Sequence, residues 1–363
     1  MSSIENKVEK EDALDFIRQN KKSIILTFLI GAVIVFIVMF MAGLEDIINV
    51  LEKTNYWLLG LSFVLEAAIL LVWTLRWKMI LDLIDESPKF TSLLLMLFAS
   101  LFGNNITPGA AGGEPLRAYI LREVKGTPFE IGFASSTADR VFEFLPFVII
   151  SILAAVLILT WSISIWTRIF VTLLIILCIM FFSVVIYAGI NKDIAQRITL
   201  SVARSVFPFA LKLTRKEVHF SDISEKLIFY INRFTTGFAM ALKDRKVLLI
   251  GFVLSFGMWG LDIIRFYVCF LAIGVQPPLL PLVIIYTVGI LISLLPLIPG
   301  SLGIREATLV GLFAVAGISA DVVVAASVID RLGSYIIPTI IGAFAAFYYG
   351  KIIVSEKKPK SLE

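Results

Sequence analysis

The stretch PGAAGGEPLRAYILREVKGTPFEIGFASSTADR, residues 108–140, returns 191 positions later as PGSLGIREATLVGLFAVAGISADVVVAASVIDR, residues 299–331. Ten of the 33 aligned positions are identical without a gap, whereas average residue usage predicts about two or three. The most informative identities are a Pro-Gly pair, two later glycines and a final Asp-Arg pair: Pro108/Pro299, Gly109/Gly300, Gly112/Gly303, Gly126/Gly317, Asp139/Asp330 and Arg140/Arg331. The sequence therefore contains an internal repeat.

Each copy of the repeat follows a short apolar run, residues 92–107 in the first copy and 282–298 in the second. Proline and glycine interrupt helices, so we expect both runs to be the first arms of broken, re-entrant hairpins. Runs of this length are also near the lower limit for a membrane span, and eight full spans are the alternative. The residues expected to form the helix breaks are Pro108, Gly109, Gly112, Gly113, Pro299, Gly300 and Gly303.

The composition indicates a membrane protein. Of the 363 residues, 59% are hydrophobic and 17% are charged, against about 25% charged in soluble domains, and the mean hydropathy is +0.94. A soluble enzyme and a disordered chain are thereby excluded. A single histidine and two cysteines give no grouping for a metal site, so we expect no metal and no cofactor. The 32 basic residues against 28 acidic ones form no stripe for nucleic acid.

We predict an all-α polytopic membrane protein with about six full spans and two re-entrant hairpins. The connection 192–246 carries eleven basic residues against five acidic ones, which places it on the cytoplasmic side. The same rule places both termini and the Arg76–Lys89 turn inside, so the two hairpins acquire opposite topology. The six segments, at about 20 residues per crossing, are Ile24–Gly43, Tyr56–Leu75, Ile131–Leu159, Ile169–Ile190, Val247–Gly274 and Val322–Tyr349.

The chain divides into a membrane domain with short cytoplasmic ends. The N-terminus lacks the cationic, apolar and small-residue regions of a signal peptide, so we expect the first helix to be retained. The few cysteines and histidines and the Lys-rich tail fit a prokaryotic protein. The expected parts are an N-terminal segment 1–23, the membrane domain 24–353 with repeat halves at about 56–190 and 247–350 joined by the basic connection 192–246, and a tail 354–363.

Ionisable residues within apolar segments are the candidate site, because a charge at bilayer depth is costly and marks a substrate path. Helix N-termini bind phosphate, and the planar fork of arginine suits it. The alternative is that these acids and bases pair with one another and hold the bundle closed. The expected substrate-binding residues are Glu114, Arg117, Asp139, Arg140, Arg305, Glu306, Asp330 and Arg331, with Glu66, Asp262 and Arg265 as secondary intramembrane charges.

Three motifs resemble a known family: NNITPGAAGGEPLR at 104–117, PGSLGIRE at 299–306, and the pair Arg76-Trp77. From about Ile24 to Ile353 the chain is similar to the lysylphosphatidylglycerol synthase transmembrane-region family, also called flippase-like or UPF0104. The resemblance implies a lipid-translocating fold with two re-entrant hairpins. It assigns the central charged positions to Glu114, Arg117, Arg305 and Glu306, whereas Asp139 stands where the family often has glutamate.

The predicted function is a flippase or scramblase for an anionic, phosphate-bearing lipid, of phosphatidylglycerol or polyisoprenyl-phosphate type, in the cytoplasmic membrane. No GxxxxGK[ST] run is present, so we expect downhill or gradient-coupled movement, with Glu114, Asp139 or Asp330 as candidate proton carriers. We expect no enzymatic activity, because the family's synthases carry a soluble aminoacyltransferase domain and this chain ends 14 residues past Tyr349. The alternative is an accessory membrane subunit that recruits a soluble lipid-modifying transferase. The expected partners are membrane lipids, with that transferase in the alternative, and no nucleic acid.

Overall fold

The computed structural model describes residues 52–84, 87–107, 112–158, 164–214, 220–293 and 303–356, together with residues 49 and 301. Several expected features lie outside these residues. They are the N-terminal segment 1–23, the first span Ile24–Gly43, the break residues Pro108, Gly109, Pro299 and Gly300, and residues 357–363 of the tail.

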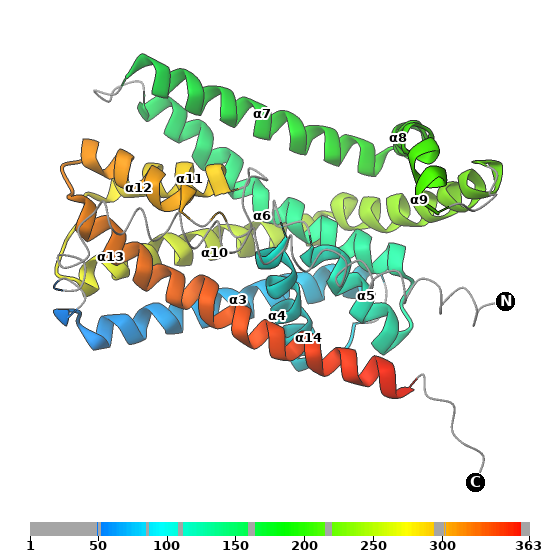
Figure 1. Cartoon of the computed structure of the whole chain (residues 1–363), viewed down its shortest axis with the longest axis horizontal. Coiled ribbons are helices and arrows are strands. Elements are labelled where there is room, and N and C mark those ends of the chain that lie inside the picture. Colours follow the sequence, from blue (N-terminus) through cyan, green and yellow to red (C-terminus); the bar gives the residue numbers. More distant parts are fainter. Residues whose placement is uncertain are drawn as a thin grey trace, which may run out of the picture.

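The described residues are almost entirely helical, and Figure 1 shows the long helices running along one axis of the molecule. The helices are α3 Tyr56–Ile84, α4 Phe90–Ile106, α5 Gly113–Lys125, α6 Phe129–Ile158, α7 Ile165–Ile190, α8 Lys192–Thr214, α9 Phe220–Lys243, α10 Arg245–Ala272, α11 Leu279–Ser293, α12 Ile304–Val315, α13 Ala320–Arg331 and α14 Ile337–Glu356. A π-helical segment, η3 Leu332–Ile336, joins α13 to α14.

Four stretches of the described residues are long and apolar enough to cross a membrane: Tyr56–Ile84, Arg168–Ile190, Arg245–Ala272 and Ala320–Ile353. The 29 residues of α3 extend about 44 Å, more than the roughly 30 Å of a hydrocarbon core. These stretches overlap four of the expected spans, and α6 overlaps a fifth. The predicted class, a helical multi-pass membrane protein, is therefore confirmed, whereas the number of six spans stays a prediction.

The prediction that a turn begins at Arg76 is wrong, whereas the placement of the turn on the cytoplasmic side stays a prediction. Helix α3 continues to Ile84, and Arg76 is fully buried beside Trp77 and Ile80. A hydropathy count treats this arginine as the end of a span, because it does not include the buried carboxylate that neutralises it.

Helix order repeats along the chain in register with the sequence repeat. Helices α3 and α10 begin 189 positions apart, and so do α4 and α11. Helices α5 and α12 begin 191 positions apart, as do α6 and α13. The second broken pair is therefore two residues longer than the first, counted from the start of its first arm to the start of its second. The correspondence therefore extends from the matched sequence to four successive helices in each half.

Each predicted break separates two helices that pack against each other, α4 with α5 and α11 with α12. Figure 1 shows α5 toward the end of the bundle that holds α9, and α11 and α12 toward the opposite end. Glycine is required at the first break, because a Cβ atom on Gly113 would lie 2.5 Å from the Asn104 amide. At the second break Gly303 has a φ of +82°, which disfavours other residues.

The basic connection 192–246 folds into α8 and α9, and α9 packs on α6. Phe238 and Ala241 of α9 are fully buried in a cluster with Ala134 and Phe142 of α6. The C-terminal part of α9 therefore belongs to the helix bundle.

Candidate functional site: two buried networks of ion pairs

The first network is centred on Asp139 of α6. Arg76 of α3 donates from Nε to Oδ1 at 2.7 Å, and Arg117 of α5 donates from Nη1 to Oδ2 at 3.1 Å. Trp73 Nε1 also donates to Oδ2, at 2.7 Å. The side chains of Arg76, Arg117 and Asp139 are at most 1% exposed. One carboxylate therefore binds donors from two neighbouring helices away from solvent.

Arg140 forms the second, more open arm of the first network. Its Nε lies 3.6 Å from Oε1 of Glu114 in the first turn of α5, and its Nη1 lies 3.6 Å from Oε2 of Glu143. These side chains are 20%, 11% and 30% exposed, respectively. This arm is the more exposed part of the network.

The second network has the same design around Asp330 of α13. Arg265 of α10 donates from Nη1 to Oδ1 at 2.6 Å, and Arg305 of α12 donates from Nη1 to Oδ2 at 2.9 Å. Arg331 donates from Nε to Oε1 of Glu306 at 2.7 Å. The other oxygen of Glu306 accepts the Gly303 N–H at 2.7 Å, so this carboxylate also caps the start of α12.

The same five roles recur in both halves. An aspartate binds one arginine from the long helix and one from the short helix, and the neighbouring arginine binds a glutamate in the first turn of the short helix. The short-helix residues are displaced by one to three positions from the 191-residue spacing, so an ungapped alignment does not match them. The equivalent residues are Asp139/Asp330, Arg140/Arg331, Arg76/Arg265, Arg117/Arg305 and Glu114/Glu306.

The second network contains two further acids. Asp262 Oδ1 accepts from Arg265 Nη2 at 2.5 Å, and Asp262 Oδ2 accepts from the Tyr286 hydroxyl at 2.7 Å. Glu66 of α3 places Oε2 at 3.2 Å from Arg265 Nε. In the first network Arg76 Nη1 donates instead to the neutral Ser255 hydroxyl at 2.9 Å.

The structure brings all eight expected substrate-binding residues into these networks, and the three secondary charges join the second one. It also shows the pairing of acids with bases that the sequence left open as the alternative. Sequence reasoning missed Arg76 as a network member and Trp73 as a donor to Asp139. Arg76 could have been identified from the repeat. It lies 189 positions before Arg265, the same spacing that separates the starts of α3 and α10.

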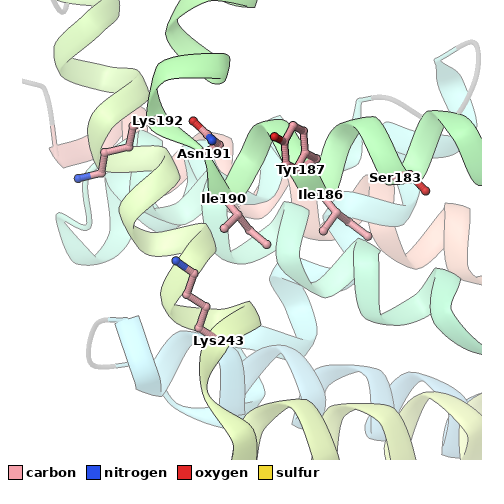
Figure 2. Close-up of a pocket in the computed structure, with 7 residues that line it drawn as sticks. All are labelled: Ser183, Ile186, Tyr187, Ile190, Asn191, Lys192 and Lys243. Atoms are coloured by element: carbon pink, nitrogen blue, oxygen red, sulfur yellow. The ribbon is translucent and has the colours of Figure 1, made fainter.

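A surface pocket of about 660 Å³ lies away from the networks, where α7 ends and α8 begins. Figure 2 shows Lys192 and Lys243 on one part of its wall and Ile186, Tyr187 and Ile190 on another. The remaining lining residues are Ser183 and Asn191. Among the described residues, none that lines this pocket belongs to a network.

Comparison with known proteins agrees with the motifs that flank these networks. Residues 24–342 match the family described as Lysylphosphatidylglycerol synthase TM region. The chain belongs to this family. A UPF0104 membrane protein of Methanothermobacter thermautotrophicus is 62% identical over 348 residues, covering 96% of this chain and 99% of the relative. A second from that organism is 30% identical over 334 residues, covering 92% and 97%. One from Pyrococcus horikoshii is 28% identical over 339 residues, covering 91% and 98%.

Proposed function

We propose that this protein is a lipid transporter, not an enzyme, that moves a phosphate-bearing anionic lipid across the cytoplasmic membrane. The observation that carries the proposal is the pair of buried ion-pair networks of the same design inside a bundle of apolar helices. Charged residues in membrane spans mark substrate paths. Discontinuous helices at matching places in two repeats are typical of transporters.

The proposal includes re-entrant hairpins of opposite topology. Helices α5 and α12 begin at matching places in the repeat but lie toward opposite ends of the bundle (Figure 1). That placement is expected if one broken pair enters from each side of the membrane. The lipid path then runs between the two halves, with one network on each side of it.

We assign the headgroup contact to Arg140 and, in the second half, to Arg331. Their side chains are 20% and 13% exposed, whereas Asp139 and Asp330 are buried among arginines. A phosphate offers arginine two parallel charge-assisted hydrogen bonds, and it competes at Arg140 with the carboxylates of Glu114 and Glu143. The headgroup therefore replaces carboxylates as the partner of Arg140, while Asp139 keeps the helices together.

The test is a leaflet-accessibility assay in proteoliposomes that carry either fluorescent phosphatidylglycerol or a fluorescent polyisoprenyl phosphate, with a quencher added outside. The wild type is expected to bring more of at least one lipid to the quencher than empty liposomes do. An Arg140→Gln/Arg331→Gln variant is expected to lose this gain. A Lys192→Gln/Lys243→Gln variant removes the same charge at the surface pocket and is expected to retain it.

Two further measurements keep the test decisive. Arg331→Gln removes the guanidinium group that lies 2.7 Å from Glu306, which is expected to destabilise the protein. The melting temperature of each variant is therefore measured. If the double variant does not fold, Arg140→Gln alone is tested. If the wild type moves neither lipid faster than empty liposomes under any imposed gradient, the transporter proposal is wrong. Loss of cellular function in the lysine variant alone would then favour the accessory subunit, because those lysines belong to the basic connection 192–246.

A further inference from the structure

The two networks differ in charge. In the described structure the first holds three arginines and three acids, Arg76, Arg117, Arg140, Glu114, Asp139 and Glu143. The second holds three arginines and four acids, Arg265, Arg305, Arg331, Glu66, Asp262, Glu306 and Asp330. With every group ionised, the first network is neutral and the second carries one surplus negative charge. A buried charge without a counter-charge is costly.

The surplus charge is concentrated around Arg265. Three carboxylates share this one guanidinium, at 2.6 Å for Asp330, 2.5 Å for Asp262 and 3.2 Å for Glu66. Asp330 has a second arginine, Arg305, at 2.9 Å, and Asp262 has the hydroxyl of Tyr286. Glu66 therefore has the weakest compensation of the three.

The contact between Glu66 and Arg265 lacks hydrogen-bond geometry. Arg265 Nε is buried and makes no hydrogen bond in the described part of the chain, although Glu66 Oε2 is only 3.2 Å away. Glu66 itself is 9% exposed. A nearly buried carboxylate thus faces a buried N–H donor, but the two groups do not form a hydrogen bond with each other.

Comparison of the two halves shows that the shared design does not require an acid at this place. The residue 189 positions after Glu66 is Ser255, and the residue 189 positions after Trp73 is Asp262. Ser255 meets Arg76 across α3 and α10 just as Glu66 meets Arg265. The first network therefore has a neutral hydroxyl and an indole at the positions where the second network has two carboxylates.

We propose that Glu66 is a proton-binding site, and that its proton is the coupling ion of the lipid movement proposed above, on which this inference rests. A proton neutralises the surplus charge without needing the space or the ligands of a metal ion. The charged groups that face Glu66 are Arg265 and Asp262 of α10 and Asp330 of α13. The Asp262 side chain is 24% exposed and provides the route by which the proton reaches water.

Proton binding to Glu66 alters a contact between the two halves. Glu66 lies on α3 and Arg265 on α10, and these two helices pack along each other. When Glu66 is protonated, its ion pair with Arg265 is lost, while Arg265 keeps Asp330 and Asp262 on its own half. The proton therefore removes one contact between the halves without dismantling either network.

The first test needs no lipid transport. Infrared difference spectra of the purified protein in nanodiscs are recorded between alkaline and acidic buffer. We expect a band from the C=O stretch of a protonated carboxyl group that is lost in Glu66→Gln and in Glu66→Ser, which installs the residue found at the equivalent position of the first network. Ser255→Ala, at the equivalent position, is expected to retain the band. If the band is unchanged in both Glu66 variants, the proposal is wrong.

The second test uses the proteoliposome assay with and without an imposed pH gradient. We expect the gradient to change the rate of lipid movement in the wild type and to have no effect in Glu66→Gln, which mimics the protonated state. If the wild type moves lipid equally with and without the gradient, coupling is refuted and the transporter proposal stands. If the band is present but no lipid moves, the coupling is likewise refuted, and only the proton site remains. A sodium-dependent rise in melting temperature that Glu66→Gln abolishes would identify sodium as the counter-ion and overturn the proposal.

Discussion

Asp139→Asn removes the charge that joins three helices of the first half. Asp139 is fully buried and accepts hydrogen bonds from Arg76, Arg117 and Trp73. Asparagine preserves the shape of the side chain but leaves two buried guanidinium groups without their carboxylate. It also presents an NH₂ donor where one of the two carboxylate oxygens accepted a hydrogen bond.

The expected loss of stability follows from burial. Removing one partner of a buried ion pair costs about 3–5 kcal/mol. The matched control is Asp82→Asn, because Lys78 Nζ lies 2.7 Å from Asp82 Oδ2, the same distance that separates Arg76 from Asp139. The Lys78 and Asp82 side chains are 33% and 46% exposed, and exposed ion pairs contribute at most about 1 kcal/mol.

The assay is the melting temperature of each purified variant in the same detergent. With about 2–4 °C lost per kcal/mol, Asp139→Asn is expected to melt roughly 6–20 °C below the wild type. Asp82→Asn is expected to lose no more than about 4 °C. Equal shifts for the two variants would refute the reasoning, because the two ion pairs share their distance and differ in burial.

Two further variants test individual contacts. Trp73→Phe keeps the ring and removes the N–H that lies 2.7 Å from Asp139, so a loss of about 1.5–3 kcal/mol is expected as a melting shift smaller than that of Asp139→Asn. Gly113→Ala places a methyl group 2.5 Å from the Asn104 amide and is expected to cost about 1–3 kcal/mol. Its control, Gly257→Ala in α10, meets nothing within 4 Å and is expected to leave the melting temperature unchanged or to raise it.

The broken helices were predictable because their signal is local. The Pro-Gly pairs and the glycines after them end an apolar run wherever they occur, and α4 ends at Ile106, two residues before Pro108. The repeat was predictable for a related reason, because identical Asp-Arg pairs at identical distances need no tertiary information.

The pairing within the networks was not predictable in the same way. Arg76 and Asp139 are 63 positions apart in the sequence. Trp73 is 66 positions from Asp139, and Arg265 is 65 positions from Asp330. Only the packing of the helices brings such residues together. Hydropathy also misjudged Arg76, since a span can continue through an arginine when a buried carboxylate neutralises it.

The strongest network contacts lie within each half rather than between the halves. The short charge-assisted bonds, such as Arg76 with Asp139 at 2.7 Å and Arg265 with Asp330 at 2.6 Å, lie within one half. Among the side chains of the described network residues, the contacts that cross between halves are the neutral bond of Arg76 to Ser255 and the 3.2 Å pair of Arg265 with Glu66. A transporter of repeated halves must shift one half against the other around a fixed site. Here such a shift leaves both aspartate-centred networks intact and breaks only their weaker contacts, one of which a single proton on Glu66 already removes.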